Sequence, residues 1–477
     1  MLEKFVPLFM PKTVAVVGAS AKGTALPNVF IRRIREYGFS GDIYPIHPTA
    51  PTIDGIPAYP NLAATPKPVD YAYIAVSGAQ IPDMLKVAAG RVRYAQVISS
   101  GFGEVDEGKD LQSRLLAAAR EGGMRLIGPN CLGVYSPRGR ITFTEISPTE
   151  VGHVGVISQS GGLGTDIIRR GLARGVKFSG LVTVGNCADI APSDLLEFYL
   201  ADDQTKVIGF YIETAKDGRR LFELLREAKA KKPVVILKGG RTGQGLAAAA
   251  SHTGSLAGDE RAWVALSRQT GCVLVDTLDQ FIDTLLVFQA LTPQPQHPTR
   301  RVALFGNGGG TSVLATDGYA RLGLDVTPFA QPALDALAAL KLPPGTSITN
   351  PVDCPVSTLQ QENGSVAEKI LDEIYSKGKP EAVVMHLNMS AFAGRTPPEV
   401  IENVLQAALR VQAKYPGQAH FLLVLRSDGE PELEVRKRKF RDSALALGIP
   451  VYDEMSNAGH ALAALQAHER FVHTRGG

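Results

Sequence analysis

The sequence predicts an α/β fold with three doubly wound units, each built on a mainly parallel sheet. One pattern occurs three times: a short apolar run, a glycine-rich turn, and a segment with helical character. An apolar run without polar alternation is typical of a strand buried on both faces, as in parallel sheets. The three copies begin at Val14, Val154 and Val302. The predicted units are residues 1–148, 149–292 and 298–477.

The first unit is predicted to continue with further short strands, each stopped by Gly, Ser or Pro. In an open parallel sheet the ligand lies beyond the carboxyl ends of the strands, which is where these stops gather. A helix is predicted at residues 111–120, between two of the strands. The strands, including the residues that stop them, are residues 42–48, 71–76, 95–103 and 125–130.

In the second unit, a helix with one apolar stripe follows the strand at residues 154–158. A loop at residues 251–258 is expected before a helix that begins near Asp259. Residues 291–299 are rich in Pro and Gln and are predicted to be an interdomain linker. The remaining strands of this unit are predicted at residues 180–184, 207–212 and 233–238. The third unit is predicted to have glycine turn 306–310, turn 350–353, and strands at 382–386, 420–425 and near Val451.

The composition is that of an ordinary globular protein of 477 residues, 44% hydrophobic and 20% charged. A net charge of +3 without a basic tract offers no electrostatic surface for nucleic acid. The four cysteines contain no CxxC pair, which argues against a metal site or a disulfide framework and fits a reducing cytosol. No signal sequence or membrane-length apolar run is visible, so we expect a cytoplasmic protein.

A histidine near the middle of the chain is the first candidate for chemistry. His252 lies in residues 251–258, a run too poor in bulky side chains to be a core element. Glu213 follows an apolar strand and is expected at the carboxyl edge of the sheet. A carboxylate that accepts one ring N–H fixes the tautomer in which the other nitrogen is a nucleophile, and stabilises the positive ring formed on attack. Each residue alone could be a solvated loop residue, and for a lone histidine that is the better interpretation.

Two glycine-rich turns are candidate anion sites. Ser160, Gly161 and Gly162 open a predicted helix, where small residues let backbone N–H groups approach a phosphate. The turn at Gly18 lacks the GxGxxG fingerprint, and no acidic residue ends the next strand, which disfavours NAD and a dehydrogenase. Backbone N–H groups near Ser20, with Lys22, could still bind a pyrophosphate. Either turn could also be purely structural.

These stretches resemble the NDP-forming acyl-CoA synthetases, the superfamily of succinyl-CoA synthetase and ADP-forming acetyl-CoA synthetase. The resemblance covers nearly the whole chain, in the order of the ADP-forming enzyme's α subunit. It implies a Rossmann-like CoA-binding domain followed by two flavodoxin-like domains. The most specific matches are residues 211–213, 238–241 and 251–258, the last resembling the family's phosphohistidine loop. Residues 152–161, 128–133 and 350–353 resemble the phosphate segment, the end of the CoA domain and a third-domain motif.

The resemblance implies a three-stage acid–thiol ligase reaction, reversible in direction. Phosphate attacks an acyl-CoA thioester to give acyl phosphate and CoA. His252 takes the phosphoryl group, releasing the carboxylic acid, and then passes it to a nucleoside diphosphate. Glu213 would hold the ring, while Ser160, Gly161 and Gly162 would stabilise the phosphoryl charge. The residues that fall where the family touches CoA are Gly18, Ala19, Ser20, Lys22, Pro45, Val76, Ser100, Gly101 and Asn130.

The chain departs from the family pattern in two places. Where the family often reads Asn-Pro-Lys after the second strand, this chain has His47-Pro48-Thr49, which removes a lysine for the 3′-phosphate of CoA. No ATP-grasp domain follows the third unit, and no glycine turn is a P-loop. We therefore expect ADP or ATP and Mg²⁺ to bind on a partner ATP-grasp β subunit, or on another portion of a fused chain. The alternative is a CoA- or acyl-CoA-binding sensor or scaffold without catalysis.

Overall fold

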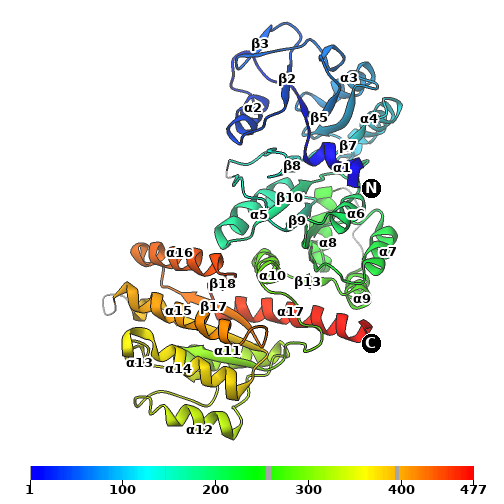
Figure 1. Cartoon of the computed structure of the whole chain (residues 1–477). Coiled ribbons are helices and arrows are strands. Elements are labelled where there is room, and N and C mark those ends of the chain that lie inside the picture. Colours follow the sequence, from blue (N-terminus) through cyan, green and yellow to red (C-terminus); the bar gives the residue numbers. More distant parts are fainter. Residues whose placement is uncertain (1, 146, 254–258, 393–396, 477) are drawn as a thin grey trace. The chain divides into compact units, whose positions relative to one another are not determined.

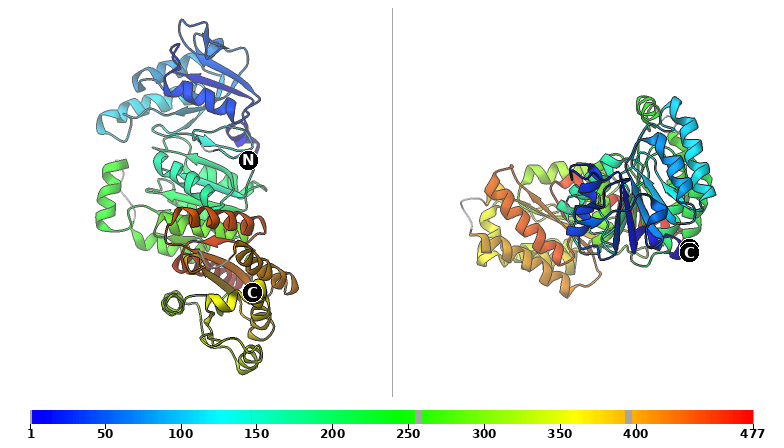
Figure 2. Two further views of the ribbon diagram at one scale, coloured as in Figure 1. Left: turned by 90° about the vertical axis from the view of Figure 1, so that its left-hand side faces the viewer. Right: turned by 90° about the horizontal axis from the view of Figure 1, so that it is seen from above.

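Each of the three glycine-turn patterns lies in a different sheet with helices on both faces, in a computed structural model that describes residues 2–145, 147–253, 259–392 and 397–476 (Figures 1 and 2). The predicted α/β fold class is confirmed. The chain divides into two compact units, Met1–Phe281 and Ile282–Gly477. From here on, "unit" refers to these two compact units. The first unit contains two of the sheets, which form its first and second domains, and the second unit contains the third sheet.

The first sheet has the strand order β2-β1-β5-β6-β7, and all its strands are parallel. Strand β1 is buried on both faces, because Val14 and Val16 pack into one core cluster while Ala15 and Val17 pack into another. An apolar run without alternation is therefore an interior strand here, as predicted. The strands are β1 (Thr13–Val17), β2 (Asp42–Ile46), β5 (Val69–Ile74), β6 (Val92–Val97) and β7 (Arg125–Ile127), with a hairpin of β3 (Thr52–Ile53) and β4 (Ile56–Pro57). The helices are α1 (Leu2–Phe9), α2 (Leu26–Glu36), α3 (Ile81–Val87) and α4 (Lys109–Glu121).

The glycine that ends β1 is required by both backbone angle and space. Gly18 has φ +98°, and a Cβ there would lie 2.3 Å from the carbonyl oxygen of Ala75, just beyond β5. We expect Gly18→Ala to lower the free energy of unfolding of the first unit by about 3 kcal/mol, as the sum of left-handed strain and a backbone clash.

The control for that variant is Gly38→Ala. Gly38 also has a left-handed φ of +90°, but beyond its chain neighbours no atom lies within 4 Å of the place a Cβ would take, so only the strain cost of about 1 kcal/mol applies. Urea denaturation of both variants measures the difference. Equal losses would show that the close approach to Ala75 is not what demands glycine at position 18.

The second sheet has the order β13-β12-β11-β9-β10-β8 and is parallel except for its edge strand β8, which pairs antiparallel with β10. Residues 251–253, expected in a loop, instead end helix α8, because an alanine-rich run with high helix propensity precedes them. Residues 254–258 of that predicted loop lie outside the described residues. The strands are β8 (Val134–Tyr135), β9 (Val154–Ser158), β10 (Phe178–Thr183), β11 (Val207–Ile212), β12 (Val234–Lys238) and β13 (Val273–Val275). The helices are α5 (Gly161–Arg174), α6 (Pro192–Ala201), α7 (Gly218–Ala228), α8 (Gly243–Thr253) and α9 (Glu260–Thr270).

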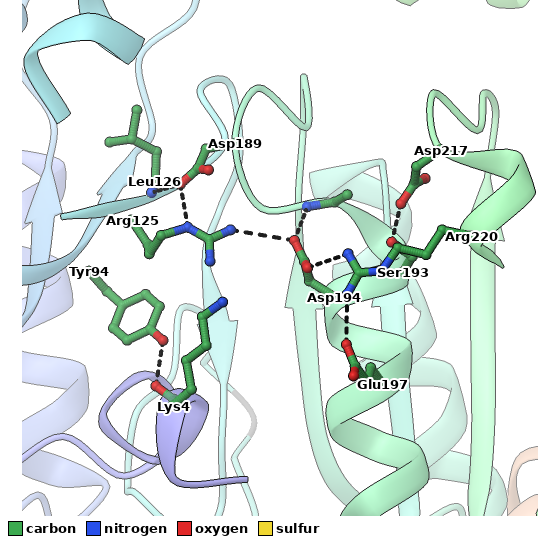
Figure 3. A network of polar contacts seen from close by, with 11 residues as sticks. Lys4, Tyr94, Arg125, Leu126, Asp189, Ser193, Asp194, Glu197, Asp217 and Arg220 are labelled. Atoms are coloured by element: carbon green, nitrogen blue, oxygen red, sulfur yellow. Dashed lines mark hydrogen bonds and ion pairs between the residues drawn. The ribbon is translucent and has the colours of Figure 1, made fainter. Parts of the chain in front are cut away.

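Apolar and polar contacts join the first two sheets into one unit. On α1, Phe9 stacks on Phe198 of α6 with ring centroids 4.4 Å apart. At the start of β7, the Arg125 guanidinium donates to Asp189 at 2.8 Å and pairs with Asp194 at 3.4 Å (Figure 3). Since these side chains are partly buried, the network holds the loops of the two sheets in a defined relation to each other.

The third sheet has the order β15-β14-β16-β17-β18 and is parallel. The predicted linker at residues 291–299 has no helix or strand, yet it is not a free spacer. The backbone N–H groups of Gln294 and Thr299 each donate to the Glu469 carboxylate at 2.7 Å, and His420 contacts the same carboxylate at 2.9 Å. The boundary between the compact units falls earlier, inside helix α10 (Leu278–Ala290).

The strands of the third sheet are β14 (Val302–Gly306), β15 (Val352–Asp353), β16 (Ala382–Asn388), β17 (His420–Arg426) and β18 (Val451–Tyr452). Its helices are α11 (Gly309–Arg321), α12 (Gln331–Ala339), α13 (Val356–Leu359), α14 (Val366–Glu373), α15 (Pro398–Lys414), α16 (Pro431–Ala446) and α17 (Met455–Gly476). Across the described residues, no helix combines the length and the apolar character needed to cross a membrane.

Candidate active site

A cavity of about 460 Å³ lies within the first unit, at loops that follow the carboxyl ends of strands from both sheets. The first sheet contributes residues after β6 and β7, and the second contributes the start of α5 and the loops after β10 and β11. A cavity of this size, lined by backbone and polar groups from several loops, suits a small ligand. The lining residues are Ile98, Asn130, Cys131, Leu132, Gln159, Ser160, Gly161, Gly162, Gly185, Asn186, Thr214 and Lys216.

The start of α5 forms one wall of the cavity. Ser160 is the N-cap, and its Oγ accepts the backbone N–H of Leu163 at 3.2 Å. A Cβ at Gly161 would lie 2.9 Å from the Leu132 side chain, so the glycine permits close packing of this turn against the first domain. First-turn N–H groups have no acceptor within a helix, and the helix dipole favours negative charge there. The predicted trio Ser160, Gly161 and Gly162 therefore lines a cavity suited to an anion.

Gln159, which sequence reasoning missed, ties this turn to the end of β11. Its Oε1 accepts the backbone N–H of Glu213 and, at 2.9 Å, that of Thr214, while its Nε2 donates to the Thr214 carbonyl at 2.8 Å. A single amide side chain thus satisfies three backbone groups. The position of Glu213 relative to the start of α5 is fixed by these hydrogen bonds.

Glu213 follows β11 directly, as predicted, and only 5% of the residue is exposed. Its Oε1 accepts the Tyr211 hydroxyl at 2.9 Å, and its carbonyl accepts the Lys238 ammonium at 2.8 Å. Burial lowers the pKa of Lys238, against the opposing effect of the Glu213 charge, and burial together with that charge raises the pKa of Tyr211. The carboxylate is therefore held in a defined orientation by a neutral phenol.

His252 lies in the last turn of α8, but its side chain is outside the described part of the chain. The predicted pairing of His252 with Glu213 consequently stays a prediction. Helix α8 follows β12, and β12 is the neighbour of β11 in the sheet. In this topology, the helix that carries His252 follows β12, and Glu213 follows the neighbouring strand β11.

The residues predicted to touch CoA lie on the edge strand β2 or after the carboxyl ends of β1, β5, β6 and β7 in the same sheet. In the turn after β1, two backbone N–H groups near the predicted pyrophosphate site are bonded within the chain. The Ser20 N–H donates to the Asn28 side chain at 2.7 Å, and the Lys22 N–H donates to Ser20 Oγ at 3.1 Å. Both backbone donors are engaged within the chain, because α2 begins at Leu26 rather than directly after the turn and Asn28 reaches back to hold it.

The loop after β6, with the predicted residues Ser100 and Gly101, is shaped by Glu104. The Glu104 carboxylate accepts the N–H groups of Gly101 at 2.5 Å and Phe102 at 3.2 Å, and also the Asn186 side-chain amide. Partial burial would raise the pKa of Glu104, but these hydrogen bonds outweigh it and lower the pKa. Asn186 belongs to the second domain and lines the cavity. The Glu104 carboxylate therefore links the loop after β6 to the second domain.

Two cysteines lie at or beside the cavity and are poor nucleophiles. Burial raises the pKa of Cys131 to about 12 and that of Cys187 to about 11. Only the thiolate is reactive, so at neutral pH both thiols are held in the unreactive form. All four cysteines of the chain are buried free thiols.

In the second unit, the predicted motif at residues 350–353 braces the third glycine turn. The Asn350 side chain accepts the Leu304 N–H at 2.9 Å and donates to the Val302 carbonyl at 3.0 Å. The Asp353 carboxylate accepts the Gly308 N–H at 2.7 Å. These bonds give the motif a structural role at the carboxyl end of β14.

Comparison with known proteins finds relatives along the whole chain. A CoA binding domain model matches residues 12–137, and a succinyl-CoA ligase like flavodoxin domain model matches residues 151–288. The α subunit of an ADP-forming acetate–CoA ligase (II) from Pyrococcus furiosus is 33% identical over 468 residues, covering 98% of this chain and 97% of the relative. An ADP-forming acetate–CoA ligase from Methanocaldococcus jannaschii is 34% identical over 346 residues, which are 72% of this chain and 48% of that relative.

Among solved structures, a dinucleotide forming acetyl-coenzyme A synthetase 1 from Ca. Korarchaeum cryptofilum, in complex with phosphate and ADP, has a TM-score of 0.84. It is 28% identical in sequence, and the match covers 99% of this chain and 98% of that chain. The similarity in fold and sequence therefore extends over both compact units.

Proposed function

This chain belongs to the ADP-forming acyl-CoA synthetase family, and we propose that it is the α subunit or α portion of an acid–thiol ligase that works through a phosphohistidine at His252. The cavity in the first unit is the observation that carries the proposal. Asn130, from the CoA-binding domain, and the Ser160–Gly162 turn, from the flavodoxin-like domain, line the same space. A thioester held by the first domain and a phosphate held by the second would meet there.

In the first stage, an oxygen of inorganic phosphate attacks the acyl carbon. The new C–O bond forms as the C–S bond breaks, and the sulfur leaves with the bonding pair as CoA. Backbone N–H groups at the start of α5 would hold the negative phosphoryl oxygens throughout, so no new solvation is needed as charge shifts. Gln159 keeps that turn and Glu213 in a fixed relation for the next stage.

In the second stage, a nitrogen of His252 attacks the phosphorus of the acyl phosphate. An N–P bond forms, the P–O bond to the acyl group breaks, and the carboxylate leaves. Glu213 would accept the N–H of the other ring nitrogen, which sets the tautomer and stabilises the positive ring. A histidine nucleophile also agrees with the chemistry of the cavity, since the nearby thiols Cys131 and Cys187 are held neutral.

The third stage needs a nucleotide site, which we assign to a partner. The Pyrococcus furiosus relative is named as an α subunit, which implies a further subunit in that enzyme. We propose that an ATP-grasp β subunit, or the corresponding portion of a fused chain, binds ADP and Mg²⁺ and accepts the phosphoryl group from His252. The four buried, unpaired thiols are consistent with work in a reducing cytoplasm.

For CoA we propose that side chains of the turn after β1 contribute more than its backbone N–H groups. The Lys22 ammonium and the Ser20 hydroxyl replace the two backbone donors that are engaged internally. His47, which stands where the family often has an asparagine, shapes the next loop instead: its Nδ1 accepts the N–H groups of Thr49 at 3.2 Å and Ala50 at 2.9 Å. The other proposed contacts are Gly18, Ala19, Pro45, Val76, Ser100, Gly101 and Asn130.

The proposal is tested by incubating the full chain with acetyl-CoA or a longer acyl-CoA and radiolabelled phosphate. We expect release of free CoA and label on the protein that is stable in alkali and labile in acid, as a phosphohistidine requires. CoA binding without label under any of these conditions, or with ATP and an ATP-grasp partner, would favour a sensor or scaffold instead.

Gln159 gives a separate prediction about positioning. In Gln159→Ala the Glu213 and Thr214 backbone groups lose their side-chain partner, so we expect protein phosphorylation to slow about 10- to 100-fold. CoA affinity should stay within about twofold, because Gln159 follows strand β9 of the second domain and is not one of the proposed CoA contacts. A matched loss of CoA binding would instead indicate general collapse of the cavity.

A further inference from the structure

The wall of the cavity at the start of α5 contains a charged residue to which neither the sequence motifs nor the relatives assign a role. Among the described lining residues, Lys216 is the only one with a charged side chain. It follows β11 by a few residues and faces the same space as the start of α5. The only charged side chain of the lining is thus a cation, which favours an anionic ligand.

The ammonium of Lys216 is directed by a hydrogen bond and is not neutralised. Its Nζ donates to the Asn186 carbonyl at 3.0 Å. Within the described residues no carboxylate lies within ion-pair distance of this Nζ, and the adjacent Asp217 accepts the Ser193 hydroxyl instead. An ammonium has three N–H donors, so one bond to a carbonyl leaves donors for a ligand.

The residue that directs Lys216 is itself held firmly. The Asn186 N–H donates to the Pro129 carbonyl at 3.0 Å, and its side-chain amide donates to Glu104 and, at 3.1 Å, to Gln112. Asn186 is thus bound by three elements of the first domain, although it belongs to the second. Lys216 is exposed, and its hydrogen bond to this anchored residue directs the ammonium to the edge of the cavity.

We propose that Lys216 binds a phosphoryl oxygen of inorganic phosphate, and of the acyl phosphate formed from it, in the cavity at the start of α5. This inference rests on the proposed function for the identity of the anion. Lysine acts as a point charge toward phosphate, complementing the directional N–H groups of the helix turn. Its role is to concentrate and hold the anionic reactant between the acyl carbon and His252.

The test measures the affinity of the full chain for inorganic phosphate by calorimetric titration. We expect Lys216→Met and Lys216→Gln to weaken phosphate binding about tenfold, and Lys216→Arg to stay within about threefold of the wild type. Lys206→Met is the matched control: Lys206 is an exposed lysine at the opposite end of the same strand β11, and its loss should change nothing.

Lys216→Gln separates the charge from the hydrogen-bonding capacity, because glutamine is neutral but keeps an N–H donor. If Lys216→Gln binds phosphate as the wild type does, Lys216 only positions the Asn186 loop and the proposal is wrong. An equal loss in Lys206→Met would show nonspecific attraction and would also overturn it. The phosphohistidine assay is independent: a chain that never labels His252, yet binds phosphate through Lys216, refutes the proposed function and not this inference.

Discussion

His252→Asn will incorporate no acid-labile phosphate when incubated with acyl-CoA and labelled phosphate, a loss on the order of 10⁴-fold or more. Asparagine is polar and close in size, but it has no nitrogen lone pair basic enough to attack phosphorus. The N–P bond cannot form, and the reaction stops after its first stage. Free CoA and an acyl phosphate should therefore still appear, since attack of phosphate on the thioester does not use the ring.

This split between stages makes the experiment specific. Free CoA is followed by thiol titration, acyl phosphate by trapping with hydroxylamine, and protein label by electrophoresis under neutral conditions. The control is His153→Asn: His153 is exposed at the start of the second domain and contacts the Gln204 carbonyl at 2.9 Å, so its loss should leave all three signals unchanged. Label on the His252→Asn protein would place the phosphoryl acceptor elsewhere.

The fold is largely predictable because its signal is local. Each interior strand is a continuous apolar run whose neighbouring residues fill opposite faces, as Val14 and Ala15 do in β1. Such runs end at small or polar residues, and these ends meet at one edge of the sheet whatever the detailed packing. The sequence alone therefore places Glu213 at the end of β11 and Ser160 at the start of α5.

The residues that sequence reasoning missed carry no local signal. Gln159 bonds to backbone groups 54 and 55 positions away, and Asn186 reaches Glu104 across 82 positions. Polar contacts of this kind have no period and no fixed spacing, so only the folded arrangement reveals them. The same holds for Asn28, which holds both the N–H and the carbonyl of Ser20 and so changes what the turn after β1 can offer a ligand.

At helix α8 the prediction is wrong although a local signal is present. The prediction gives the small residues of the histidine motif more weight than the helix propensity of the alanines before them. The small residues around His252 suggest a loop, but the alanine run just before them favours a helix that continues through residue 253. A histidine at the end of a helix is presented by its last turn. The proposed nucleophile, His252, therefore belongs to the last turn of α8.

Glu213→Gln is expected to slow phosphorylation of His252 about 100- to 10,000-fold while leaving CoA affinity within about twofold. Glutamine keeps the size of the side chain, and its amide oxygen can still accept the Tyr211 hydroxyl. It lacks the negative charge, however, and in that orientation its NH₂ group would face the imidazole N–H. The ring then lacks both the acceptor that sets its tautomer and the negative charge that stabilises the positive ring formed on attack.

Tyr211→Phe is the matched control for Glu213→Gln, because it removes the 2.9 Å hydrogen bond to the carboxylate but keeps its charge. We expect it to slow phosphorylation less than about tenfold, as loosened positioning would. Initial rates of label incorporation, with CoA affinity measured on the same preparations, decide between charge and position. If Tyr211→Phe is as slow as Glu213→Gln, geometry is the main contribution; if Glu213→Gln is as fast as the wild type, another group orients His252, and the carboxylate at the end of β11 only stabilises the strand end.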